Sequence, residues 1–360
     1  MSGSASLDSL PAEIVRRLLE RGSEVAARSA ARAAGFASAR EAIRKELEEY
    51  IVQVPDEWLD AAEGGSVAAV DGGMVCDSKS IGDLCTAAAV SVGPGDSDGD
   101  CEVWMDSVIR SPQNKEALGG IMSSMEVALA ARSAAQVVMI DGSMLSTLIN
   151  VSKGVHASRR TGGPLAVRME EARSEEFRAA VMSVLRSPRH IAMPKYTTTN
   201  EFEECLPEEF RKHDARTVVT MALRPGEMTH FAVRTSDERD DARRMLIGPA
   251  LGFRKDELDA FSEAVGGVYS CYYRPHPWAP AFRIDMTEAG YRDPEAQARA
   301  LRAVRDTTRA SGLREPFPLY LVDLFAKQVS VGASPVVEMA ALSSIDDPDA
   351  RLLLAMGYRT

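Results

Sequence analysis

Val67-Ala-Ala-Val-Asp71-Gly-Gly and Val137-Val-Met-Ile-Asp141-Gly-Ser are two apolar runs, and each stops at an aspartate that is followed by glycine. Each run has the composition of a buried β-strand, and the glycine lets the backbone turn at once. The last side chain of such a strand lies at the edge of the sheet. We therefore expect both carboxylates to project into one site, and two convergent carboxylates indicate a divalent metal ion.

The overall composition is that of an ordinary globular protein. The chain has 360 residues, of which 45% are hydrophobic, so it can bury a large core as one elaborated domain or as two. No apolar run approaches the roughly 20 residues of a membrane helix, and the Met1-Ser-Gly-Ser start lacks the features of a signal peptide. We therefore expect a cytoplasmic protein. Its five cysteines include no Cys-x-x-Cys pair, which favours reduced thiols over a zinc site or a disulfide framework.

The net charge of −11 argues against a basic DNA-binding module, because phosphate affinity comes mainly from clustered Lys and Arg. It does not exclude an enzyme that acts on nucleic acid. Basic clusters occur at Arg159-Arg160 and between Arg186 and Lys195, and a divalent ion would itself offset phosphate charge. Solvated surface is the alternative interpretation of these clusters. Neither a phosphate-binding P-loop nor a Gly-x-Gly-x-x-Gly motif after a strand is present.

The pattern of apolar residues predicts an α/β chain. An N-terminal helix over Pro11–Glu49 precedes three strands, a helix, the strand that ends at Asp141 and a further helical stretch. The three strands are expected at 67–70, 87–92 and 102–108, with a turn between the last two, and the helix after them at 114–131. Later strands are expected at 190–192, 218–223, 230–233, 268–273 and 281–284, and later helices at 170–186, 293–310 and 319–331.

This order, with acids on the first strand, the helix and the fourth strand, is the layout of a ribonuclease-H-like core, a mixed central sheet flanked by helices. The helix acid is Glu126, which lies beside the apolar stripe formed by Met125 and Leu129. It is thereby placed to point along the sheet edge. The alternative is a solvated helix glutamate, since glutamate is mostly exposed.

The acids have a specific chemical meaning if they converge. Mg²⁺ and Mn²⁺ prefer carboxylate oxygen, and phosphodiester cleavage uses such ions to activate water and to stabilise charge on the attacking and departing oxygens. Asp71, Glu126 and Asp141 would supply that site. Asp-Gly is also a common turn dipeptide, so a purely structural interpretation of each pair stays open.

The same residues resemble, in order, those of the NurA nucleases. The resemblance is carried by Val-Asp71-Gly-Gly, by Glu126 on the intervening helix and by Ile-Asp141-Gly-Ser-Met-Leu. It continues in Ala192-Met-Pro-Lys195-Tyr-Thr-Thr-Thr, and in Tyr272-Tyr273 followed by Phe282-Arg283-Ile284-Asp285.

The resemblance implies a ribonuclease-H-like core and nuclease activity on single- and double-stranded DNA that depends on Mn²⁺ or Mg²⁺. The expected activity is a 5′–3′ exonuclease with endonuclease action on single strands. The resemblance also implies a homodimer that docks on a hexameric HerA-type ATPase in DNA end resection and double-strand break repair, with no membrane partner. We expect residues 1–60 to form a helical arm and residues 61–360 to form one nuclease domain.

The resemblance further implies site residues. Asp71, Glu126 and Asp141 would be catalytic metal ligands, and Lys195 would lie near the scissile phosphate; a plain surface lysine is the alternative for Lys195. Members of the family tend to carry a tyrosine and then a histidine at the start of a late helix, where this chain has no histidine. Asp323 is the expected replacement ligand.

Other assignments around this site stay open. His276 is a second candidate for the missing ligand, and Gly73 stands where the family often has serine, a change that we expect to be tolerated. Tyr272, Tyr273 and Trp278 are candidates for stacking on unpaired bases, with core packing as the alternative.

The missing histidine also motivates an alternative function, that of a catalytically inactive ribonuclease-H-like scaffold within a DNA translocase complex. A sugar-kinase or actin-like ATPase is a third interpretation of paired Asp-Gly turns, although the longer Thr-rich hairpin of that group does not follow Asp71.

Overall fold

The computed structural model describes residues 10–93, 99–195, 201–233 and 245–356. The centre of the turn expected between the second and third strands, and the Tyr-Thr-Thr-Thr segment after Lys195, lie outside these residues. Within them, ten strands form one sheet in the order β1-β7-β9-β10-β6-β5-β2-β3-β4, with β8 pairing with β9. The strands are β1 (Ile51–Gln53), β2 (Val67–Lys79), β3 (Gly82–Val92), β4 (Asp100–Val108), β5 (Val137–Asp141), β6 (His190–Met193), β7 (Glu227–Thr229), β8 (Ala232–Val233), β9 (Val268–Arg274) and β10 (Phe282–Thr287).

The half of the sheet formed by β4-β3-β2-β5-β6 is the predicted ribonuclease-H-like core. β2, β3 and β4 are consecutive antiparallel strands, and β5 pairs in parallel with both β2 and β6. The expectation that β2 ends at Asp71 is wrong, because the strand continues through Gly72 and Gly73 to Lys79 and pairs with β3 along its length. Of the two strands, β5 alone ends at its aspartate.

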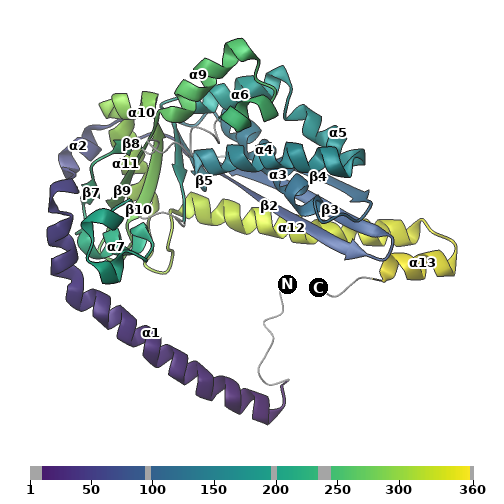
Figure 1. Cartoon of the computed structure of the whole chain (residues 1–360), viewed down its shortest axis with the longest axis horizontal. Coiled ribbons are helices and arrows are strands. Elements are labelled where there is room, and N and C mark those ends of the chain that lie inside the picture. The colour runs from purple at the N-terminus through teal and green to yellow at the C-terminus, as the bar shows by residue number, and fades with distance from the viewer. Residues whose placement is uncertain (1–9, 94–98, 196–200, 234–244, 357–360) are drawn as a thin grey trace.

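Helices cover both faces of the sheet (Figure 1). One face packs on α3, α4, α5, α6 and α9, and the other on α2, α11 and the start of α12. The described residues contain no helix that is long and apolar enough to cross a membrane. The helices are α1 (Ala12–Glu46), α2 (Asp56–Ala61), α3 (Asn114–Arg132), α4 (Met144–Thr161), α5 (Gly163–Glu171), α6 (Glu175–Arg186), α7 (Ala215–Ala222), α9 (Lys255–Gly266), α10 (Glu288–Arg292), α11 (Pro294–Thr307), α12 (Phe317–Ser343) and α13 (Pro348–Ala355).

The far end of the sheet is built from β10, β9, β7 and β1, and α1 extends away from it (Figure 1). The helix predicted over Pro11–Glu49 is confirmed as α1. The strand predicted over 218–223 is wrong, because these residues lie in α7 and the turn after it. The β-branched run suggested a strand, but the carboxylate of Asp214 accepts a hydrogen bond from the Thr217 backbone N–H and caps a helix.

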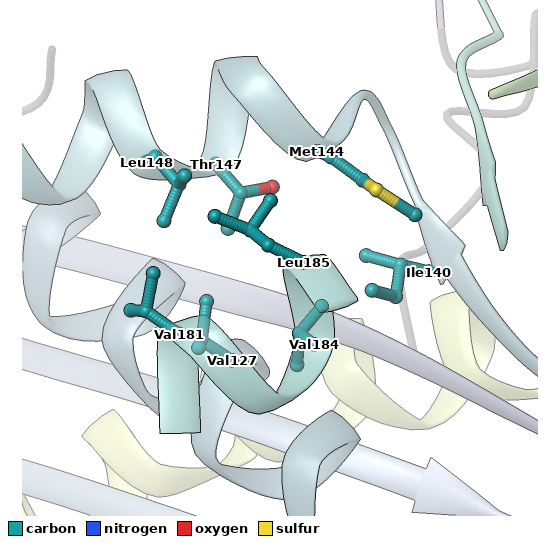
Figure 2. A pocket seen from close by; sticks show the side chains of 8 residues that line it. All are labelled: Val127, Ile140, Met144, Thr147, Leu148, Val181, Val184 and Leu185. Atoms are coloured by element: carbon teal, nitrogen blue, oxygen red, sulfur yellow. The ribbon is translucent and has the colours of Figure 1, made fainter. Parts of the chain in front are cut away.

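The crossing of α3 and α4 is a tight helix contact near the parallel strands. A Cβ built on Gly154 would lie 2.5 Å from the Cα of Gly120, so the two backbones meet where both residues lack a side chain. Beside this crossing the inner face of α4 closes on α3, α6 and β5 (Figure 2). The gap that remains there is a cavity of about 20 Å³ lined almost wholly by apolar side chains. This packing fixes which face of α4 is exposed.

We expect Gly154→Ala to lower the free energy of unfolding by about 1–3 kcal/mol, the usual cost of inserting a methyl group into a packed core. Gly332→Ala is the matched control, since Gly332 also lies in a helix but a Cβ added there would have nothing within 4 Å. That change should be neutral or stabilising by up to about 1 kcal/mol. Urea unfolding of both variants measures the difference, and equal stabilities would show that the helices can separate without cost.

Candidate metal centre

The parallel register of β2 and β5 sets Asp71 beside Asp141. Val70 pairs with Ile140, and each of these residues immediately precedes an aspartate. The two carboxylates therefore leave the same face of the sheet, since side chains alternate between faces along a strand. The Asp71 carboxylate also accepts a hydrogen bond of 2.7 Å from the Gly72 backbone N–H. The predicted convergence of the two strand acids is thus present in the structure.

Asp323 of α12 completes the cluster. One carboxylate oxygen from each of Asp71, Asp141 and Asp323 lies within 4.8 Å of the other two. The approach of α12 depends on Gly73, because a Cβ there would lie 2.5 Å from the Ala326 carbonyl oxygen. A side chain at this position would therefore require α12 to shift, so the packing of α12 uses the glycine.

Lys195 lies among these acids. Its Nζ is 2.7 Å from an oxygen of Asp141, 2.9 Å from Glu315 and 3.7 Å from Asp323. Asp323 also pairs with Lys327 of its own helix at 2.7 Å. The Lys195 side chain is about 30% exposed, so its ammonium group can contact a ligand from solvent while it stays paired with carboxylates. The plain surface-lysine interpretation does not describe this environment.

Arg216 ties together the two segments that deliver Lys195 and Glu315. Its guanidinium donates hydrogen bonds to the backbone carbonyls of Lys195, Arg314 and Ala281 at 3.0–3.1 Å. It also lies over the ring of Phe282, 5.4 Å from the centroid. One half-buried cation thus holds the backbone of three separate segments.

Glu126 approaches from α3 on the other side of β2. It is buried, and its Oε1 lies 2.7 Å from the position that a Cβ of Gly72 would occupy. The missing side chain at Gly72 is therefore what lets this carboxylate reach the strand. Among the described residues, Glu126 is not part of the group whose oxygens lie within 4.8 Å of one another. It stands behind the aspartates rather than among them.

Burial and mutual repulsion make these acids hard to ionise. Burial, reinforced by the negative charge of Asp141, raises the pKa of Asp71 to about 7. Burial, with smaller contributions from Asp71 and Asp141, raises the pKa of Glu126 to about 8. For Lys195, burial disfavours the charge, but the hydrogen bonds with Asp141 and Glu315 outweigh it and raise the pKa above its ordinary value. Added positive charge would stabilise the ionised carboxylates.

The sequence analysis missed Glu315, whose carboxylate pairs with Lys195. No local pattern signals this role, because the contact joins residues that are far apart in the chain. His276, the second candidate ligand, is not among the described residues that meet at the aspartates. Its Nε2 contacts the Arg305 carbonyl oxygen at 2.9 Å, and its ring stacks on Trp278.

The base-stacking interpretation of the two tyrosines is wrong. Tyr272 and Tyr273 are 2% and 1% exposed, and the Tyr272 hydroxyl donates to Glu201. Core packing, the alternative, describes both. Trp278 alone of the three keeps an exposed ring, with 50% of its surface accessible.

The residues of the site lie in a part of the chain that matches a known family model. The NurA domain model matches residues 65–328, which span both aspartate strands and α12 as far as Gln328. The chain belongs to the NurA domain family. No curated protein matches its sequence significantly.

Solved NurA structures share the fold at low sequence identity. The NurA nuclease from Sulfolobus solfataricus is 14% identical with a TM-score of 0.59, and the match covers 94% of this chain and 99% of that one. A NurA bound to dAMP and manganese is 11% identical with a TM-score of 0.56, over 94% and 99% of the two chains. A NurA with manganese is 10% identical with a TM-score of 0.53, over 92% and 99%.

The donor set in this NurA-family chain fits a hard divalent cation. Three carboxylate oxygens within 4.8 Å of one another need only small rotations to reach a shared ion, because ligands at about 2.1 Å from Mg²⁺ lie at most about 4.2 Å apart. The cluster contains no sulfur or imidazole donor among the described residues, which favours Mg²⁺ or Mn²⁺ over softer metals.

The raised pKa of Asp71 predicts that the metal-free protein loses stability as pH rises. The folded state keeps a proton on Asp71 up to about pH 7, whereas the unfolded chain releases it near pH 4. Ionisation of the buried Asp71 carboxylate therefore costs the folded state free energy. This cost is absent below about pH 4, grows with pH and is complete above about pH 7. In EDTA at pH 8, Asp71→Asn should raise the free energy of unfolding by at least about 1 kcal/mol, with little effect at pH 4.

Asp106→Asn is the matched control for this measurement. Asp106 is also a strand aspartate that accepts a hydrogen bond from the next backbone N–H, that of Ser107, at 2.8 Å. It lies on β4, outside the acidic cluster. Chemical denaturation at the two pH values compares the variants, and a pH-independent effect of Asp71→Asn would contradict the electrostatic explanation.

Proposed function

We propose that this protein is a metal-dependent DNA nuclease that uses Mn²⁺, with Mg²⁺ as the other candidate ion. The observation that carries the proposal is the convergence of Asp71, Asp141 and Asp323 at the edge of the parallel strands. Membership of the NurA domain family supports it. Further support comes from similar structures, which are described as a nuclease and as NurA bound to dAMP and manganese.

We assign the three aspartates to metal binding and Glu126 to the same centre as an acid that approaches through Gly72. A bound divalent cation supplies electrophilic stabilisation of phosphoryl oxygens and makes an attacking water more acidic. The aspartates fix its position, because their strands are locked in register and α12 is packed against β2. With its high pKa, Glu126 is suited to holding a proton near neutral pH.

Lys195 is the proposed phosphate contact. Its ammonium group is held by Asp141 and Glu315 and is still partly exposed, so a phosphate oxygen of the substrate can approach the same charge. Arg216 acts through the backbone carbonyl of Lys195 and is a positioning residue. A fixed cation beside the metal ligands would stabilise negative charge that develops on the reacting phosphate.

Cleavage of end-labelled single- and double-stranded DNA with Mn²⁺, Mg²⁺ or EDTA tests the proposal. We expect cleavage with Mn²⁺, none in EDTA, and a loss of at least roughly a hundred-fold in Asp141→Asn, because several kcal/mol of metal-dependent stabilisation would disappear. Asp106→Asn should keep full activity. Comparing 5′- and 3′-labelled ends tests the proposed 5′–3′ polarity, and a circular single strand tests endonuclease action.

Two results would count against the assignment. Full activity of Asp141→Asn would remove that carboxylate from the mechanism. A wild-type protein that cleaves nothing, with or without an added HerA-type hexameric ATPase, would favour the inactive scaffold. The HerA-type partner and a role in end resection during double-strand break repair belong to this proposal through the family relationship.

We also propose a homodimer whose interface includes α12. Beyond the metal centre this helix exposes the apolar residues Leu324, Phe325, Val331, Val336 and Met339, although its opposite face packs on β2 and β3. Exposed apolar residues concentrated on one element are typical of an interaction surface. Residues 1–60 are the proposed arm and residues 61–360 the proposed single nuclease domain; β1 anchors the arm by pairing with β7.

Light scattering at micromolar concentration should give twice the chain mass of 38.9 kDa. Val331→Asp should shift the mass toward that of a monomer, because it places a charge on the apolar surface of α12. Leu19→Asp is the control, since Leu19 is similarly exposed, at 60% against 63%, but lies on α1. A monomer mass for the wild type would contradict the proposed dimer. Equal effects of the two changes would contradict an interface on α12.

A further inference from the structure

The exposed face of α4 carries no acidic residue. The chain carries 53 acidic residues, yet none lies between Met144 and Thr161. The exposed positions of the helix are polar or basic: Ser146, Asn150, Lys153, His156, Arg159 and Arg160. Among the described residues no ion pair involves Lys153, Arg159 or Arg160, whereas many other arginines of the protein are paired with carboxylates.

The packing of α4 makes this face a continuous line. Ser146, Asn150, Lys153 and Arg160 recur at spacings of three, four or seven residues, which places them on one side of a helix. The opposite side is held by Gly154 against Gly120 and by the apolar contacts of Figure 2. The basic side therefore cannot rotate inward without opening the core.

The N-terminal end of α4 follows the metal centre directly in the chain, although α4 packs on the sheet face opposite α12. β5 ends at Asp141, and α4 begins at Met144 after the turn at Gly142 and Ser143. At 1.5 Å per residue the helix runs about 24 Å from Met144 to Arg160, and Lys153 and Arg160 are about 10 Å apart along it. Along the axis of a DNA duplex, that length corresponds to roughly seven base pairs at a rise of about 3.4 Å, and it corresponds to fewer nucleotides of an extended single strand, whose phosphates lie farther apart.

We infer that this face of α4 binds the phosphate backbone of the DNA strand whose scissile bond lies at Asp71, Asp141 and Asp323. The inference rests on the proposed nuclease function and adds the path of the substrate outside the site. An acid-free helix face whose cations form no ion pair with the described residues is complementary to a polyanion, and in a chain of net charge −11 it gives a strand a favourable direction of approach. Ser146 and Asn150 offer uncharged donors nearer to the site.

Binding of fluorescent single-stranded DNA to the full chain in EDTA tests the inference without cleavage. Oligonucleotides of four and twenty nucleotides are compared with the wild type and with the double variant Lys153→Gln/Arg160→Gln. We expect the double variant to bind the long oligonucleotide roughly tenfold more weakly. The slope of log K against the logarithm of the salt concentration should become shallower by about 1.4, at about 0.7 per lost phosphate contact on a single strand. The short oligonucleotide, which cannot reach both residues from the site, should lose less than about twofold.

Lys212→Gln/Lys255→Gln is the matched control. It removes two exposed lysines and the same net charge elsewhere on the surface, and neither lysine forms an ion pair among the described residues. This control should bind both oligonucleotides like the wild type. Lys153→Arg/Arg160→Lys, which preserves both charges, should retain binding of the long oligonucleotide and so separates a charge effect from a folding defect.

The outcomes distinguish the inference from the function on which it rests. Unchanged affinity and salt dependence in the α4 double variant would overturn the inference, and so would an equal loss in the control. Cleavage of DNA by the wild type with Mn²⁺ would still uphold the proposed function in either case. A wild type that neither binds nor cleaves DNA would overturn both. In Mn²⁺, a raised KM for the long strand with kcat retained would support a role in binding outside the site.

Discussion

Repulsion among carboxylates that are held close together is the constraint on which this structure depends. Asp71, Asp141 and Asp323 come from two strands and a helix that are far apart in sequence, yet their oxygens lie within 4.8 Å. Nothing about the acids themselves favours that arrangement, since burial and neighbouring charge raise the pKa of Asp71. The free energy must come from the rest of the fold, namely the parallel register of β2 and β5 and the helices packed on both faces. Lys195 offsets part of the repulsion.

Two adjacent glycines of β2 allow a helix to approach the strand closely on each face of the sheet. Gly72 leaves room on one face for the buried carboxylate of Glu126, and Gly73 leaves room on the other for the backbone of α12 at Ala326. The glycines therefore do not end the strand, as a turn would, but bring two helices closer to it than side chains would allow. Each approach carries an acid, because Glu126 lies on α3 and Asp323 on α12.

The local pattern of the sequence was sufficient for most of the elements and for part of the site. Apolar strands with acids after them predicted the convergence of Asp71 and Asp141, since the last side chains of such buried strands lie at the edge of the sheet. The end of β2 was wrong because Gly-Gly is compatible both with a turn and with a close approach of helices, and only tertiary packing decides between them. The helix α7 was missed because its β-branched residues favour a strand locally, whereas Asp214 caps a helix. Glu315 was missed because its role depends on Lys195, about 120 residues earlier in the chain, through a contact that no local pattern encodes.

α12 connects the site with the surface proposed for dimerisation. Its buried side places Asp323 beside the strand acids and Ala326 against Gly73, and its exposed side carries Leu324, Phe325 and Val331. These residues are interleaved along less than three turns of one helix. A partner that orders the exposed side would therefore also restrict the position of Asp323, because a helix transmits displacement along its hydrogen-bonded backbone. If the dimer forms through this surface, subunit association and metal binding would share a free-energy coupling, and each would strengthen the other.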